Sequence, residues 1–220
     1  MERGRVMEVR HPSEYFKKKI VFETERLILR RIETGDSRDM YEYASREETS
    51  RYLLWLPHGS EYSTRFVIEG LKRDYKAGTY FELAIILREN GKMIGTSGIT
   101  SFDAQNRVAE IGYVLSPDYW GMGIAKEAAA VLMNLAFCEL GANRVEAKYM
   151  KGNENSRRVM EKLGMTFEGI QRAKLYVKGE YRDIGVCSIL ASEYFAVPRE
   201  NLYKKFNGNG IFDGLFSRIK

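Results

Sequence analysis

A loop with two alternating glycines carries the clearest chemical signal in this 220-residue sequence. Gly121 and Gly123 come directly before an alanine-rich segment, 124–140, whose pattern predicts a helix. Glycines let a ligand approach the backbone, and the free N–H groups and dipole at a helix start favour an anion. The loop therefore predicts a site for a diphosphate group. The alternative is an ordinary glycine-rich turn.

Two other phosphate-binding loops are excluded by residue type. A Rossmann fingerprint needs a third glycine where Lys126 stands. A P-loop needs Gly-x-x-x-x-Gly-Lys-Ser/Thr, which the sequence lacks. The strand expected before the loop, 108–115, also belongs to an antiparallel meander and does not open a βαβ unit.

The elements around this loop follow from the spacing of apolar residues. Expected strands are 26–32, 80–87, 93–102, 108–115, 144–150, 165–177 and 181–190, and expected helices are 36–43, 47–54, 60–76, 124–140 and 153–162. Asp36 is a predicted N-cap, as is Ser60 or Ser63, and Asn90-Gly91 predicts a hairpin. This order predicts one mixed α/β sheet, mostly antiparallel, with helices on both faces.

Composition sets broad limits on function. Lys and Arg number 35 against 30 Asp and Glu, a net charge of +5, which suits a polyanionic partner or simply a soluble basic protein. Two cysteines and two histidines argue against a disulfide framework and against a zinc cluster. The start of the chain lacks an apolar signal core, and no apolar run reaches the ~20 residues of a membrane helix. The cytoplasm is the expected location.

Residues 119–128, Tyr-Trp-Gly-Met-Gly-Ile-Ala-Lys-Glu-Ala, resemble the acetyl-CoA loop of the GNAT superfamily of N-acetyltransferases. The family pattern is Gln/Arg-x-x-Gly-x-Gly/Ala, and Trp120 stands where Gln or Arg is usual. The Trp-Gly-x-Gly version is similar to the Rim branch, which acetylates ribosomal-protein N-termini. Segments 24–27, 110–113, 153–165 and 181–183 also resemble parts of that branch, in the same order. The likeness spans about residues 22–195.

The resemblance implies a single GNAT domain over 20–195, with an N-terminal arm at 1–19 and an amphipathic extension at 196–220. The extension carries apolar residues at helical spacing, namely Ile211, Phe212, Leu215, Phe216 and Ile219. An exposed apolar face of this kind favours association. We expect it to dock on its own chain or across a homodimer, with no role for a membrane or a nucleic acid.

The resemblance also implies acetyl-CoA as cosubstrate, a primary amine as acceptor, and no metal. The cosubstrate-binding residues would be Trp120, Gly121, Met122, Gly123, Ile124, Ala125 and Lys126, together with backbone N–H groups of Tyr113, Val114 and Leu115. Asn153 is expected on the pantetheine and Ser156 on the thiol side, where Ser156 is a catalytic candidate. Helix capping is the alternative role for both. Arg157, Arg158 and Lys162 are candidates for the ribose phosphate or are solvated helix positions.

Amine acetylation needs a proton to leave the ammonium before attack. An α-amine, with a pKa of about 7.7–8.0, needs only a modest base, such as a carboxylate acting through water. Glu110 is the predicted base because its strand leads to the loop; the alternative is a structural carboxylate. Trp55, His58 and Tyr62 are predicted to form a wall of the acceptor site, and hydrophobic packing is the alternative for them.

Two departures from the family pattern bear on the chemistry. Met160 stands where many members carry a Tyr that protonates the departing thiolate, and Cys187 replaces a frequent Tyr of the last strand. A small-molecule amine as acceptor, or a non-catalytic acyl-CoA-binding module, therefore stays open beside acetylation of a protein N-terminus.

Overall fold

A mixed β-sheet organises the chain in the computed structural model, which describes residues 9–18, 20–79, 81–197, 204–207 and 210–211. The described helices are α1 (Pro12–Phe16), α2 (Ser37–Ala44), α3 (Glu47–Ser50), α4 (Glu61–Ala77), α5 (Ile124–Asn134), α6 (Glu154–Lys162) and α7 (Ala191–Ala196). The described strands are β1 (Ile20–Glu23), β2 (Leu27–Arg30), β3 (Glu82–Leu87), β4 (Met93–Asp103), β5 (Val108–Leu115), β6 (Arg144–Met150), β7 (Thr166–Val177), β8 (Glu180–Leu190), β9 (Lys204–Asn207) and β10 (Gly210–Ile211). None of these helices is long and apolar enough to cross a membrane.

The strand order across the sheet is β10-β9-β1-β2-β3-β4-β5-β6-β8-β7. The predicted meander is confirmed, because β3 pairs with β4 and β4 with β5, both antiparallel. The predicted hairpin of β7 and β8 is confirmed as well. Among the described pairs, β5 and β6 alone run parallel. The mixed, mostly antiparallel sheet is therefore as predicted.

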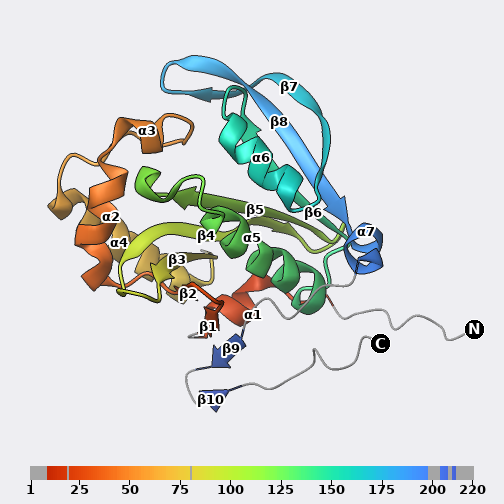
Figure 1. Cartoon of the computed structure of the whole chain (residues 1–220), viewed down its shortest axis with the longest axis horizontal. Helices are drawn as coiled ribbons and strands as arrows, with labels where there is room; N and C mark the ends of the chain where they lie inside the picture. The colour runs from red at the N-terminus through yellow and green to blue at the C-terminus, as the bar shows by residue number, and fades with distance from the viewer. Residues whose placement is uncertain (1–8, 19, 80, 198–203, 208–209, 212–220) are drawn as a thin grey trace, which may run out of the picture.

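Helices cover both faces of the sheet (Figure 1). Helices α5, α6 and α7 contribute buried side chains to one apolar core, which also receives Phe16 of α1. A second, smaller core joins α2 and α4 to the opposite face. Two cores on two faces agree with the architecture predicted from the order of the elements.

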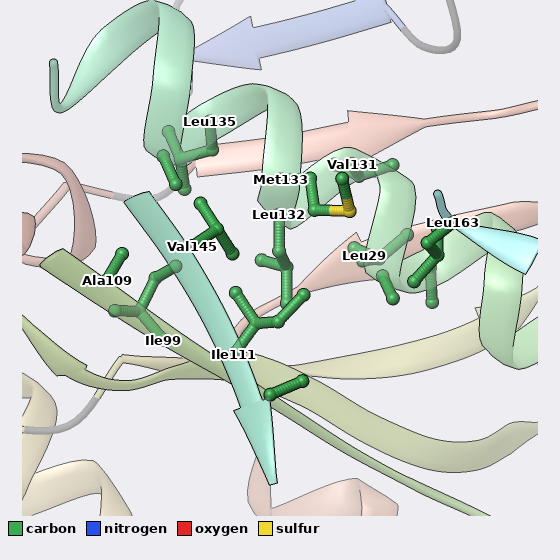
Figure 2. Close-up of a cluster of buried hydrophobic side chains, with 14 of the residues drawn as sticks. Leu29, Ile99, Ala109, Ile111, Val131, Leu132, Met133, Leu135, Val145 and Leu163 are labelled. Atoms are coloured by element: carbon green, nitrogen blue, oxygen red, sulfur yellow. The ribbon is translucent and has the colours of Figure 1, made fainter. Parts of the chain in front are cut away.

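Helix α5 supplies the centre of the larger core (Figure 2). Val131, Leu132 and Leu135 are fully buried, and Leu132 and Leu135 lie on the side of Ile111 of β5 and Val145 of β6. A turn of π-helix, Leu135–Glu139, extends α5, and Gly141 follows with a φ of 69°. The core therefore fixes the helix whose N-terminus follows the glycine loop.

Truncating Leu132 to alanine should lower the free energy of unfolding by about 2–5 kcal/mol, because it leaves a cavity at a fully buried position. Urea unfolding followed by circular dichroism measures the change. Leu54→Ala is the matched control, since Leu54 is 66% exposed and its truncation should change stability by under ~0.5 kcal/mol. Equal losses in the two variants would contradict this assignment of the core.

Helices α4 and α2 both start where the sequence predicts, after Ser60 and Asp36, but only Ser60 caps its helix through the side chain. Ser60 Oγ accepts the Ser63 N–H at 3.0 Å, as a capping side chain does. Asp36 precedes α2 without capping it. Its carboxylate instead accepts from both terminal nitrogens of Arg30, at 2.8 and 2.7 Å, and from the Glu33 N–H at 2.8 Å. A bidentate arginine partner is stronger than a cap, so Asp36 ties the end of β2 to α2.

Both terminal segments have described residues that contact the domain. Phe16 is buried at 3% exposure, so part of the expected arm 1–19 belongs to the core. Strand β9, from the expected extension 196–220, pairs antiparallel with β1. Ile211 lies in β10, opposite Phe206 of β9, and does not begin a helix. The other four apolar residues of the expected helix lie outside the described residues.

Candidate active site

The structural basis of the site is a gap between two neighbouring strands. β5 and β6 pair only from Val108 to Glu110, opposite Arg144 to Glu146. Beyond this point β5 continues to Leu115 alongside β4, and β6 continues to Met150 alongside β8. The two strands thus diverge from Glu110 onward, which leaves the backbone of β5 without a strand partner on that side.

The hydrogen-bond alternation of β4 and β5 decides which backbone groups face the gap. The Ser116 N–H donates to the Ile94 oxygen at 2.8 Å. In an antiparallel ladder every second residue points to the same neighbour, so Val114 bonds to β4 whereas Tyr113 and Leu115 face the gap. The Leu115 carbonyl there accepts the Trp120 indole N–H at 2.8 Å. Of the three predicted backbone donors, the geometry therefore favours Tyr113 and Leu115 and places Val114 in the sheet.

The glycine loop leads from the end of β5 into α5. Gly121 and Gly123 have φ angles of 78° and 77°, in the left-handed region that favours glycine. Gly123 is the N-cap of α5, and Met122 beside it is 55% exposed. Ile124 is buried, Ala125 is half-buried and Lys126 is exposed. The loop thus offers accessible backbone at a helix N-terminus, which fits a diphosphate.

Ser156 faces the gap from α6 and is bonded to Tyr113 of β5. The Tyr113 hydroxyl lies 3.1 Å from Ser156 Oγ and donates to the Ser156 carbonyl at 3.0 Å. Burial raises the pKa of Tyr113 to about 12, so its phenol stays protonated at neutral pH. Met160, one turn further along α6, is buried in the core at 1% exposure. The family's usual tyrosine position is therefore a packing position in this chain.

Asn153 begins α6, and its Oδ1 accepts the Ser156 N–H at 3.2 Å. The capping role considered for Asn153 is thus present. Asn153 also lines a hollow of about 220 Å³ that Trp120 and Tyr52 border. The other residues lining it are Glu48, Arg51, Gly152, Glu154 and Asn155. The hollow thus lies between α3, the glycine loop and the start of α6.

Glu110 is the last paired residue before β5 and β6 diverge. Its Oε2 accepts Lys148 Nζ at 2.5 Å, and the carboxylate side chain is 24% exposed. Glu146, directly across on β6, pairs with Arg144 at 2.7 Å, and its Oε2 also lies 3.8 Å from Lys148 Nζ. A half-buried carboxylate thus lies at the apex of the gap, the point where the two strands begin to diverge. Its ion-pair partner there is Lys148.

A second hollow, of about 360 Å³, lies next to this ion pair and is lined by Lys148, Glu146 and Glu168. Glu168 of β7 accepts from Arg144 NH1 and from Ser188 Oγ, each at 2.7 Å. The hydrogen bond from Arg144 is the main cause that lowers the pKa of Glu168 to about 2. Ionic contacts therefore continue from Glu110 across β6 to β7.

The three residues predicted for the acceptor wall do not share one environment. Trp55 and His58 are together, with ring centroids 5.3 Å apart, and Trp55 packs against the smaller core as Val114 does. His58 Nδ1 lies 2.8 Å from Thr64 Oγ1, and burial lowers the pKa of its imidazole. Tyr62, in the first turn of α4, is 82% exposed. The first two fit a wall near β5, whereas Tyr62 fits an outer surface.

The basic residues of α6 and the substituted Cys187 lie in different environments. Arg157 pairs with Glu161 at 3.0 Å and stacks over Phe167, while Arg158 and Lys162 are exposed. Cys187 is fully buried in the larger core. Within the described part of the chain, no cluster of His, Cys, Asp or Glu could hold a metal ion.

Sequence reasoning overlooked two tethers of this site. Lys178, in the turn between β7 and β8, donates to the Ser50 carbonyl at 2.7 Å and so links that hairpin to α3; in Figure 1 the hairpin extends toward α3. Arg26, just before β2, donates to the Met122 carbonyl at 2.9 Å. Both partners are main-chain oxygens distant in sequence, so no local pattern points to them.

Comparison with known proteins agrees with this geometry. The family model described as "Acetyltransferase (GNAT) domain" matches residues 26–166. The "Uncharacterized N-acetyltransferase p20" of Bacillus licheniformis is 34% identical over 171 residues, 78% of this chain and 96% of the relative. The spermidine N(1)-acetyltransferase of Escherichia coli K12 is 25% identical over 179 residues, 80% of this chain and 94% of that enzyme.

A solved structure of RimL, a ribosomal L7/L12 α-N-protein acetyltransferase in complex with coenzyme A, has the same fold. The two structures superpose with a TM-score of 0.64 at 21% sequence identity, and the match covers 76% of this chain and 95% of that one. The family model spans well over half of the chain, and the p20 likeness covers most of both proteins. This chain belongs to the GNAT family of N-acetyltransferases, enzymes whose acetyl donor is acetyl-CoA.

Proposed function

We propose that this enzyme transfers the acetyl group of acetyl-CoA directly to the α-amine of a protein N-terminus. The observation that carries the proposal is the divergence of β5 and β6 at Glu110, beside the glycine loop at the start of α5. Strand β5, on one side of the gap, offers backbone N–H donors, and the glycine loop offers a site for a diphosphate. Glu110, at the apex of the gap, offers a carboxylate. These are the three parts that acyl transfer from a diphosphate-bearing thioester to an amine needs.

The donor would lie along β5, from the loop toward the apex. Backbone N–H groups at Gly121 to Lys126 would bind the diphosphate, as a helix N-terminus does. The gap-facing backbone of Tyr113 and Leu115 would bind the pantetheine amides and orient the acetyl carbonyl. Asn153 would contact the pantetheine from the opposite side, since it lines the hollow at the open end of the gap.

Glu110 would accept the proton that the ammonium must lose before it attacks the thioester carbon. The amine nitrogen then forms the new C–N bond and the C–S bond breaks. The second proton lost from that nitrogen passes to the departing thiolate, which leaves as the thiol of CoA. A carboxylate suffices because an α-amine, with a pKa of about 7.7–8.0, is already partly neutral at pH 7. The ion pair with Lys148 holds this carboxylate in place at the apex of the gap.

Ser156 would supply a hydrogen bond to the departing sulfur, supported by the protonated Tyr113 phenol. Ser156→Ala should lower kcat about tenfold, the worth of one such bond, with little change in the KM for acetyl-CoA. Steady-state kinetics over a range of both substrates measures this. Ser192→Ala, at a distant surface position of α7, is the control. A raised KM with unchanged kcat in Ser156→Ala would show a binding role instead.

The outer surface beside Trp55 supports a protein acceptor. Leu54, Leu56, Tyr62 and Phe66 are each between 66% and 82% exposed. Large apolar side chains exposed in one segment are typical of surfaces that contact other proteins. A small polyamine would need no such surface, whereas a protein whose N-terminus enters the gap would lie against it.

Spermidine or a related polyamine is the second candidate acceptor. Glu48 and Glu154 line the hollow beside the loop and would attract a cationic amine, although Arg51 lines it as well. The relative named a spermidine acetyltransferase acts on such a molecule.

One assay separates the two candidates. The full-length protein is incubated with acetyl-CoA and, in parallel, with a library of peptides bearing free N-termini, with the same peptides blocked at the N-terminus, and with spermidine. Mass spectrometry then measures the acetyl shift on each amine. Acetylation of free but not blocked peptides supports the proposal. Acetylation of spermidine alone overturns it in favour of the polyamine, and CoA binding without transfer would mean a non-catalytic binding module.

A further inference from the structure

Arg26 connects the start of β2 to the glycine loop by two separate bonds. Its Nε donates to Glu127 Oε2 at 2.7 Å, and its NH1 donates to the Met122 carbonyl at 2.9 Å. The other oxygen of Glu127 accepts from Thr24 Oγ1 at 2.5 Å and from the Arg26 N–H at 3.2 Å. The Glu127 carboxylate is therefore fully engaged by the segment Thr24–Arg26.

The Arg26 segment is itself held rigidly at the edge of the core. The Arg88 N–H donates to the Arg26 carbonyl at 2.9 Å, and Arg88 NH1 donates to the Thr24 carbonyl at 2.8 Å. Leu27, the next residue, is fully buried. The guanidinium thus projects to the loop from an anchored backbone.

The groups that Arg26 engages are those that would oppose an anion at this loop. Glu127 lies in the first turn of α5, where its charge would repel a diphosphate at Gly123. The Met122 carbonyl, a negative dipole end, belongs to the residue before Gly123. A Cβ built on Gly123 would lie 3.6 Å from Arg26 NH2, so the guanidinium is also beside the backbone that would bind the diphosphate.

We propose that Arg26 is a positioning residue for the donor site: it neutralises Glu127, turns the Met122 carbonyl away from the diphosphate, and sets the shape of the loop. This inference rests on the proposed use of the loop for the diphosphate of acetyl-CoA. It predicts an effect confined to donors that carry a diphosphate, because neither bond of Arg26 reaches the gap where acetyl transfer would occur.

The test compares two acetyl donors in the Arg26→Met variant. S-acetylpantetheine keeps the thioester and the pantetheine amides but lacks the diphosphate. The variant should raise the KM for acetyl-CoA about 10- to 100-fold, the loss expected for charge-assisted bonds. The kcat with saturating acetyl-CoA and the kcat/KM for S-acetylpantetheine should stay close to the parent values.

Three further variants test which property of Arg26 the donor site requires. Adding Glu127→Gln to Arg26→Met removes the uncompensated carboxylate and should recover part of the affinity for acetyl-CoA. Arg26→Lys keeps the charge but lacks the planar guanidinium that donates to two groups at once. Its KM for acetyl-CoA should therefore lie between those of the parent and Arg26→Met. Arg65→Met removes an exposed arginine of α4, paired with Glu61 at 3.8 Å, and should leave both donors unaffected.

The outcomes separate this inference from the proposed function. An unchanged KM for acetyl-CoA in Arg26→Met, or equal losses with both donors, overturns the role of Arg26. A parent protein that binds no CoA in calorimetry and acetylates no amine overturns the proposed function instead, before any variant is compared. A selective loss with acetyl-CoA and its partial rescue by Glu127→Gln support the inference.

Discussion

Glu110→Gln is expected to lower kcat/KM for acetyl transfer by about 10²–10⁴-fold, the usual contribution of a general base. Glutamine keeps the size of the side chain and its place at the apex of the gap but cannot accept the proton of the ammonium. The loss should fall on kcat more than on the affinity for acetyl-CoA, because Glu110 lies away from the loop. The dependence of the rate on pH should also change shape, since the proposed base is gone.

Two other variants test whether Glu110 acts in the reaction or only in the sheet. Lys148→Met breaks the same ion pair from its other end but keeps the carboxylate, so it should cost as much stability as Glu110→Gln and lose much less activity. Glu146→Gln removes the carboxylate directly across on β6 and controls for the loss of a charge. If Lys148→Met and Glu110→Gln lose activity equally, or if the pH–rate profile of Glu110→Gln matches the parent, Glu110 is a structural residue.

Gly123→Val is expected to abolish measurable binding of CoA, at least a 100-fold rise in Kd. A branched side chain at this N-cap would project into the place where the diphosphate would lie. The protein itself leaves room for it, because the nearest atom to a Cβ at this position would be 3.6 Å away, an ordinary contact. The φ of 77° adds backbone strain of about 1–3 kcal/mol. Isothermal titration calorimetry with CoA gives the affinity, and thermal unfolding gives the stability.

Gly91→Val separates the effect of backbone strain from the effect of a side chain in the place of the diphosphate. Gly91 has a φ of 73° and, like Gly123, leaves room for a Cβ, but it lies in the turn between β3 and β4. Both variants should therefore lose similar stability, while Gly91→Val binds CoA as the parent does. Retained CoA binding in Gly123→Val would remove the loop from the donor site.

The parts of the fold that sequence predicted are those fixed by local patterns. The Asn90-Gly91 turn and the period-two alternation on either side of it predict β3 and β4 without reference to any other segment. Likewise Ser60 precedes an apolar helical stripe, and it caps α4 as expected. Asp36 also takes the predicted N-cap position of α2, but its side chain does not cap the helix because Arg30 competes for the carboxylate. A cross-element partner of this kind has no signature in the neighbouring residues.

The candidate site also has parts that local sequence patterns predict and parts that they do not. The glycine loop could be located because φ angles near 78° demand a residue type that the sequence displays. The orientation of Val114 toward β4 could not, since it depends on the register of two strands. The bond of Tyr113 to Ser156 joins residues 43 apart, and a tyrosine in a strand is equally typical of plain packing. Register and long-range contacts, which no local pattern encodes, make up the rest of the site.

The pairing of β9 with β1 has a consequence for self-association. An uncovered edge strand offers a row of free N–H and C=O groups to another molecule, and proteins guard against this with bulges, charges or a covering segment. The β7 edge has two register shifts and bears Glu168, Arg172 and Lys174, so it is protected by irregularity and charge. At the other end β1 is short and apolar, and β9 covers it. Proteolytic loss of the chain from Lys204 onward would expose this edge, and the shortened protein would be prone to edge-to-edge aggregation even with the gap between β5 and β6 intact.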